Sequence, residues 1–205
     1  MKKEEVRKWV DSTRKTLDAC RKFSKLCGKP FDRGFIGELL VLERLLKTYG
    51  AKLCSFAANG FQYVGSANKR WDISLTLGKK TVYLNAKATR VKDKTKNPRW
   101  VRQQAKTYCV IEVDPETSKQ IVGKEIDIDN GSNLFYVFVD VDTWIKHGTT
   151  NFFTLSHKKA AEIFSKKYSR LYHNRVRESR STDFWIEYKD VKEFTDPNLR
   201  RLFKQ

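Results

Sequence analysis

The segment 71–88 constrains the fold more than any other part of this 205-residue chain. It contains two runs, 71–77 (WDISLTL) and 80–88 (KTVYLNAKA), in which apolar and polar residues alternate around Gly78-Lys79. Such alternation is typical of half-buried strands, and a glycine that opens a two-residue loop favours a type II′ hairpin. Asp72 then lies across from Asn85, whereas a four-residue loop would put it across from Lys87.

Two helices are expected before this hairpin. Residues 3–27 carry apolar side chains at helical spacing, and a Gly-Lys-Pro sequence ends the pattern. Asp32 is a good N-cap for a second helix, 33–49, which Gly50 ends and which is apolar around most of its circumference. Glu38 is unusual in the first turn of such a buried helix. The helix N-terminus stabilises its carboxylate, or Glu38 is a functional acid that faces a cleft.

The remaining sequence is rich in predicted strands. The most β-like run, 134–141 (LFYVFVDV), is typical of a central strand. Ser156 is expected to cap a basic helix over 156–180. The other expected strands are 51–57, 61–67 (extended or looped), 109–113, 120–128, 151–155 and 183–188. We therefore predict one domain over 1–205, with an N-terminal helix 3–27, a core of about 33–155, the basic helix 156–180, and a C-terminal strand and tail 181–205.

The charge of the chain is both high and unevenly distributed. Lysine and arginine number 42 against 24 acidic residues, which gives a net charge of +18. Residues 90–108 and 157–180 each carry a net charge of +6, whereas 109–156 carries −5. A single basic run is commonly a solvated face, but two separated basic blocks that contain aromatic residues favour a phosphate-backbone contact. The first partner to consider is therefore a polyanion.

Several classes of protein are disfavoured by the sequence. No run of 18 uncharged apolar residues is present, and the first residues contain no apolar signal region, so we expect neither a membrane span nor a secretory signal. The four cysteines show no C-x-x-C spacing and none is spaced with a histidine as in a zinc finger. Free thiols in a reducing cytosol are the expectation, and a structural zinc is disfavoured.

The chemistry-bearing residues follow a specific order: Glu38 on a helix, Asp72 at the start of a strand, and Asn85-Ala86-Lys87 on the next strand. This arrangement resembles the PD-(D/E)XK nuclease superfamily, whose members have a Glu-bearing helix, a hairpin strand with Asp, and (Asp/Glu)-x-Lys on the following strand. The resemblance covers roughly residues 33–90, with looser agreement downstream. It implies an α/β fold with a restriction-endonuclease-like mixed β-sheet core flanked by helices.

The resemblance also implies roles for these residues. Asp72 is expected to bind a metal ion, with Asn85 at the second acidic position and Glu38 as an auxiliary acid that reaches the metal directly or through water. Lys87 is expected to be the catalytic lysine, which orients the attacking water or balances charge in the transition state. The implied cofactor is Mg²⁺, with Mn²⁺ as a substitute, because a divalent cation neutralises the phosphodiester and acidifies a water.

Asn85 departs from the family pattern, which usually has Asp or Glu at that position. An amide oxygen can coordinate Mg²⁺ but brings no negative charge, so a lower metal affinity is expected. Three alternatives follow: an active variant, a relocated acid, or a fold kept for binding alone. Asn85 and Lys87 could also simply form the polar face of a half-exposed strand.

The function that the resemblance implies is a Mg²⁺-dependent endodeoxyribonuclease on duplex DNA, of type II restriction character and with a homodimer cutting both strands. The alternative is a nuclease-like fold that binds nucleic acid with little or no turnover, and charge alone does not exclude RNA. The residues expected to contact nucleic acid are the cations of the two basic blocks: Lys94, Lys96, Arg99, Arg102, Lys158, Lys159, Lys166, Lys167, Arg170, Arg175 and Arg177.

Overall fold

The computed structural model describes residues 1–65, 71–89, 91–92, 98–102, 111–113, 120–122, 133–160, 163 and 184–203. The helices are α1 (Lys3–Cys27), α2 (Arg33–Leu53), α3 (Val141–His147) and α5 (Tyr188–Val191), with short 3-10 turns at Lys192–Phe194 and Arg200–Phe203. The strands are β1 (Gly60–Tyr63), β2 (Ile73–Leu77), β3 (Lys80–Ala88), β4 (Val91–Lys92), β5 (Pro98–Arg102), β6 (Ile111–Val113), β7 (Gln120–Val122), β8 (Leu134–Val139), β9 (Phe152–Ser156) and β10 (Phe184–Glu187).

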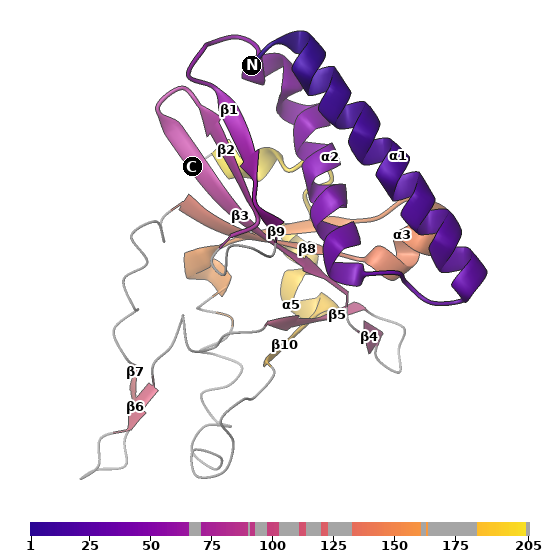
Figure 1. The fold of residues 1–205 in the computed structure, drawn as a ribbon. Helices are drawn as coiled ribbons and strands as arrows, with labels where there is room; N and C mark the ends of the chain where they lie inside the picture. Colours follow the sequence, from indigo (N-terminus) through magenta and orange to yellow (C-terminus); the bar gives the residue numbers. More distant parts are fainter. Residues whose placement is uncertain are drawn as a thin grey trace.

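The main sheet has five strands in the order β1-β2-β3-β8-β9, and it is mixed because β3 and β8 are parallel whereas the other neighbours are antiparallel. Helix α2 packs on one face of this sheet and α1 lies outside α2 (Figure 1). All six residues of β8 are buried, so the predicted central strand is confirmed, although it ends at Val139. The observed class is therefore mixed α/β, with helices flanking a mixed sheet.

The hairpin register matches the sequence prediction. Ile73 pairs with Leu84 and Leu77 pairs with Lys80, so the loop has two residues, and Gly78 has a φ of +61°. Both primed turn types require a positive φ at their first central residue, a conformation that glycine adopts without steric cost. Continuing this register places Asp72 opposite Asn85, and the four-residue alternative is excluded.

The expected end of the second helix was wrong. Helix α2 continues through Gly50 to Leu53, so the strand expected at 51–57 does not form. Gly50 is buried, and a Cβ atom on it would lie 3.0 Å from Cγ1 of Val6 on α1. The glycine thus lets α1 approach closely, and the apolar contact between the helices offsets its low helix propensity.

Three short elements, α3, β4 and β5, lie where no helix or strand was predicted from the sequence. Helix α3 begins at Val141, and the Oδ1 of its N-cap Asp140 accepts a hydrogen bond from the Thr143 backbone N–H at 3.1 Å. Strand β5 lies inside the first basic block and pairs with β10, which confirms the strand expected at 183–188. Strands β6 and β7, which pair antiparallel, lie within the strands expected at 109–113 and 120–128. Strand β1 overlaps the segment 61–67 that was expected to be extended or looped, and β9 corresponds to the strand expected at 151–155.

The predicted basic helix is described only at its start. Residues 157–160 are helical, and the Ser156 Oγ accepts a hydrogen bond from the Lys159 backbone N–H at 3.3 Å, which confirms the expected cap. Most of 161–180 lies outside the described residues. Cys20, Cys27 and Cys54 are free thiols, and Cys109 also lies outside. Among the described helices, none is both long and apolar enough to cross a lipid bilayer.

Candidate active site at the end of the β2–β3 hairpin

Asp72 is held in place by backbone hydrogen bonds from three directions. Its N–H donates to the Leu84 carbonyl at 2.8 Å, which extends the pairing of the hairpin by one residue. Its carbonyl accepts from the backbone N–H groups of Val64, at 2.9 Å, and Gly65, at 3.3 Å. These bonds tie the residue to both neighbouring segments, so its position is set by main-chain geometry.

The Asp72 carboxylate is buried against β3. Its Oδ2 accepts a hydrogen bond of 2.6 Å from the Ala86 backbone N–H, and the residue is 8% exposed. Ala86 lies between Asn85 and Lys87, so the bond fixes the carboxylate beside the Asn-Ala-Lys sequence. Asn85 is equally buried, and Lys87 is half-buried. The structure therefore brings together Asp72, Asn85 and Lys87 as the sequence predicted.

Glu38 reaches this group from α2. Its Oε2 accepts a hydrogen bond of 2.8 Å from the Tyr63 hydroxyl on β1. Gly65 borders the same group, because a Cβ atom on it would lie 3.3 Å from Glu38 Oε2, and its φ of +53° favours glycine. Glu38 belongs to the second turn of α2, not the first as expected, since the helix begins at Arg33. The helix N-terminus thus explains little of its placement, because that effect fades beyond the first turn.

The electrostatics of the two carboxylates show that they interact. Burial, and next the charge of Glu38, raise the pKa of Asp72 to about 7, although the Ala86 hydrogen bond and Lys87 oppose this change. Burial also raises the pKa of Glu38, and the charge of Asp32 adds to this effect, whereas the Tyr63 hydroxyl and Lys87 oppose it. Asp72 is thus penalised for carrying charge near Glu38. Raised carboxylate pKa values in a partly buried site are typical of functional acids.

The donor set fits a hard divalent cation incompletely. A cation between Glu38 and Asp72 would relieve their repulsion, and the Asn85 amide could supply a third oxygen. In the described part of the chain, no group of three or more His, Cys, Asp or Glu side chains is placed to hold a metal ion. A Mg²⁺ ion here would therefore depend on two carboxylates and would complete its octahedron with neutral ligands and water.

The expected nucleic-acid contacts are described only in part. Lys158 is exposed, and the Lys159 ammonium lies 5.9 Å from the ring centroid of Phe194. Arg99 and Arg102 lie on β5, opposite Glu187 and Phe184 of β10. The other expected contacts lie outside the described residues: Lys94, Lys96, Lys166, Lys167, Arg170, Arg175 and Arg177.

Comparisons with known proteins add no relative. No protein-family model, curated protein or solved structure matches the chain. The case for a function therefore rests on the residues of this site and on their chemistry.

Sequence reasoning missed Tyr63. The segment 61–67 carries no pattern that distinguishes a tyrosine at a site from one in a core, and only the packing of β1 beside α2 brings its hydroxyl to Glu38. Burial, and next the hydrogen bond to Glu38, raise the pKa of Tyr63 well above its usual value. The hydroxyl therefore keeps its proton at neutral pH and donates a hydrogen bond to Glu38.

Tyr63→Phe should destabilise the chain by about 2 kcal/mol at pH 8, because a hydrogen bond to a charged acceptor is lost. The loss should shrink as the pH falls and Glu38 becomes protonated. Tyr49→Phe is the matched control, since the Tyr49 hydroxyl donates to the neutral Leu199 carbonyl at 2.7 Å. Urea unfolding of both variants at pH 5 and pH 8 tests this. A loss of only about 1 kcal/mol or less at both pH values for Tyr63→Phe, as for a neutral acceptor, would show that Glu38 carries no charge at pH 8.

Proposed function

We propose that this chain is a Mg²⁺-dependent endodeoxyribonuclease that hydrolyses phosphodiester bonds in duplex DNA, of type II restriction character. The observation that supports this most strongly is the short hydrogen bond from the Ala86 N–H to Asp72 Oδ2. It fixes an acid against an Asn-x-Lys sequence on the adjacent strand, with a second acid, Glu38, close enough to raise the pKa of the first.

The fold proposed with this function is restriction-endonuclease-like. A helix that bears the auxiliary acid, the β2–β3 hairpin, and a strand β8 parallel to β3 occur in the order that the resemblance implies. Asp72 lies at the end of the hairpin where β3 reaches Lys87 and the chain continues toward β4. This order of elements places acid, amide and lysine at one end of the sheet, so it supports the proposal without depending on sequence identity.

The chemistry of the site follows from its charges. Bound Mg²⁺ would supply charge neutralisation at the scissile phosphate and a water of lowered pKa. Asp72 and Glu38 would hold the ion as carboxylates, which requires both to lose their protons. The Lys87 ammonium, which lowers the pKa of both acids, would orient the attacking water and balance the charge of the transition state.

Duplex DNA is the proposed partner because the charge of the chain suits a polyanion. The net charge of +18 includes two basic blocks, 90–108 and 157–180, whose cations would contact phosphates and, where an arginine reaches the major groove, guanine edges. A homodimer would place two sites on opposite strands. RNA is the weaker candidate partner, since the resemblance that supports the proposal is to restriction-type enzymes, which act on duplex DNA.

The second candidate function is a nuclease-like fold that binds nucleic acid without cleaving it. The observation that favours it is Asn85, which leaves two carboxylates where the family usually has three. In that case the raised pKa values of Asp72 and Glu38 would record a site in which at least one acid stays protonated. Binding would then be strong and salt-dependent, and independent of divalent cations.

Digestion of plasmid and genomic DNA with Mg²⁺ or Mn²⁺ distinguishes these functions. We expect discrete fragments from the wild-type chain, and loss of cleavage with retained DNA binding in Asp72→Ala and Lys87→Ala. Lys8→Gln is the control, because Lys8 is an exposed cation of α1 that pairs with Glu4, far along the sequence from the hairpin. Tight binding by the wild-type chain without any cleavage would contradict the nuclease proposal and support the binding function.

Asn85→Asp tests the position of the metal in the same assay. The change adds a third carboxylate, so cleavage should reach half of its maximal rate at a Mg²⁺ concentration about tenfold lower, and the maximal rate should rise. An unchanged dependence on Mg²⁺ would show that residue 85 does not contact the ion.

A further inference from the structure

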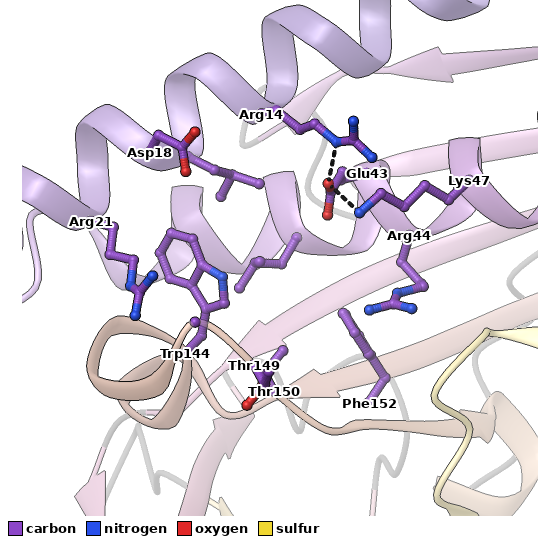
Figure 2. Close-up of a pocket in the computed structure, with 13 residues that line it drawn as sticks. Arg14, Asp18, Arg21, Glu43, Arg44, Lys47, Trp144, Thr149, Thr150 and Phe152 are labelled. Carbon is purple, nitrogen blue, oxygen red and sulfur yellow. Dashed lines mark hydrogen bonds and ion pairs between the residues drawn. The ribbon is translucent and has the colours of Figure 1, made fainter.

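A pocket of about 500 Å³ lies away from the hairpin site, where α1, α2, α3 and the start of β9 meet (Figure 2). Its floor is apolar, with Leu17, Leu40 and Trp144 among the residues that form it. Cationic side chains from α1 and α2 surround this floor: Arg14, Arg21, Arg44 and Lys47.

The pocket is distinct from the candidate active site. The α2 residues that line it are Leu40, Glu43, Arg44 and Lys47, and each lies at least about 120° around the helix axis from Glu38. Glu38 faces β1 and the hairpin, whereas these four residues face α1 and β9. A ligand of the pocket therefore does not need the hairpin carboxylates.

Positive charge exceeds negative charge in the pocket. Four cations line it against two carboxylates, Asp18 and Glu43. One of these carboxylates serves two cations, because Glu43 Oε1 lies 3.1 Å from Arg14 Nε and 2.6 Å from Lys47 Nζ. An unbalanced charge of about two units therefore remains around an apolar floor, and it would attract an anion.

Arg21 is fixed in place without an acidic partner. Its Nε donates to the Ile145 carbonyl at 3.0 Å, and its guanidinium lies 6.0 Å from the centroid of the Trp144 ring. Within the described ranges, no carboxylate lies at ion-pair distance from it. Because carbonyl groups and an aromatic ring orient this guanidinium, its positive charge is available to an anionic ligand.

Arg44 is likewise oriented by an aromatic ring and an uncharged hydrogen-bond acceptor. Its Cζ lies 5.3 Å from the centroid of the Phe152 ring, and its Nη1 donates to the Asn198 amide oxygen at 3.4 Å. Its Nε is shielded from solvent and has no acceptor among the residues that the structure describes. An unsatisfied buried donor on a cation is costly, and an anion beside the guanidinium would offset that cost by Coulomb attraction.

We propose that this pocket binds a small organic phosphate monoester of about the size of a mononucleotide. A phosphate monoester carries nearly two negative charges at neutral pH, which matches the unbalanced charge, and its oxygens suit the fork geometry of Arg21 and Arg44. The apolar floor would accommodate the organic part. The exposed hydroxyl of Thr149, at the rim, is a further donor for the phosphate.

Isothermal titration calorimetry of the full chain, in EDTA, tests this with adenosine 5′-monophosphate as the probe. We expect a dissociation constant below about 1 mM, and no binding of adenosine. Arg21→Gln and Arg44→Gln should each weaken binding at least about tenfold. Lys8→Gln, which removes an exposed cation of α1 outside the pocket, should leave it unchanged.

The outcomes distinguish the pocket from general charge and from the nuclease site. Equal weakening by Lys8→Gln and Arg21→Gln would show nonspecific attraction to a basic protein and would overturn the proposal. Equal affinity for inorganic phosphate would overturn the assignment to an organic monoester. Asp72→Asn should not change the affinity for adenosine 5′-monophosphate. The pocket proposal is therefore tested independently of DNA cleavage.

Discussion

At pH 8, Asp72→Asn is expected to unfold at a higher temperature than the wild-type chain and to lose about 1000-fold in DNA cleavage. Opposite effects on stability and activity are characteristic of a residue whose buried charge lowers the stability of the fold but is needed for activity. Thermal unfolding followed by tryptophan fluorescence, beside the plasmid digestion assay, measures both effects on the same preparation.

The stability gain follows from the raised pKa of Asp72. Its pKa of about 7 in the folded chain exceeds the usual 3.8, so the folded state binds a proton more tightly than the unfolded state does. Stability from this group is therefore present below about pH 4 and is lost as the pH rises through 7. Above pH 7 the folded chain bears the full cost of the buried charge, which the asparagine avoids.

The size of the gain is a few kcal/mol, since each unit of pKa corresponds to about 1.4 kcal/mol. For a chain of this length that corresponds to a rise of about 5–10 °C in Tm at pH 8, and to almost none at pH 4. Mg²⁺ should raise the Tm of the wild-type chain at pH 8, because binding to the folded state stabilises it, and should have little effect on Asp72→Asn.

Asp140→Asn is the matched control, because Asp140 is a carboxylate of nearly the same exposure, 7%, at the start of α3. Its oxygens accept hydrogen bonds from the Thr143 backbone N–H and hydroxyl, at 3.1 and 2.7 Å. This substitution should lower the Tm at pH 8, because it removes the charge that strengthens these bonds and replaces the oxygen that accepts from the Thr143 hydroxyl with an amide nitrogen. A lower Tm for Asp72→Asn as well would show that Asp72 is a structural acid, and the nuclease proposal would lose its main support.

The hairpin could be predicted from the sequence because its determinants are local. Alternation in the two strands assigned the faces, and Gly78 favoured a two-residue loop, so the sequence placed Asp72 opposite Asn85 or, with a longer loop, opposite Lys87. The structure selects the two-residue loop. A one-residue change of register would have moved every apolar side chain to the opposite face, which explains why the register is so strongly determined.

The missed features depend on contacts between distant segments. Gly50 is a helix terminator by local propensity, yet Val6 on α1 packs against it and the helix continues to Leu53. Tyr63 became part of the site only through the packing of β1 beside α2. The charges of the pocket between α1, α2, α3 and β9 come from α1 and α2, whose facing residues are set by their packing. Local pattern cannot report these juxtapositions, because each needs a partner far along the chain.

Gly37→Val is expected to destabilise the chain by about 3 kcal/mol and to reduce cleavage beyond what the loss of folded protein explains. Gly37 is buried where α2 crosses β3, and a Cβ atom on it would lie 3.0 Å from Cβ of Ala88 and 3.5 Å from its Cα. Overpacking of this kind costs about 1–3 kcal/mol, and a β-branched residue adds a helix-propensity cost. Urea unfolding measures the stability change.

The effect on cleavage follows from the neighbours of the two contacting residues. Glu38 follows Gly37 on α2, and Lys87 precedes Ala88 on β3, so the close contact of the glycine and the alanine sets the distance between the auxiliary acid and the hairpin site. Because Ala88 is part of the sheet backbone, it cannot yield as a flexible side chain can, and α2 must shift instead. That shift would move Glu38 from Asp72 and weaken Mg²⁺ binding, so cleavage should need a higher Mg²⁺ concentration.

Gly60→Ala is the control for glycine replacement as such, because a Cβ atom on Gly60 meets nothing within 4 Å. It should leave both the stability and the Mg²⁺ dependence nearly unchanged. If Gly37→Val, assayed where it is fully folded, kept the wild-type Mg²⁺ dependence, the position of Glu38 would not matter for metal binding. The metal site would then consist of Asp72 and the Asn-x-Lys strand alone, because these residues belong to the hairpin and do not move with α2.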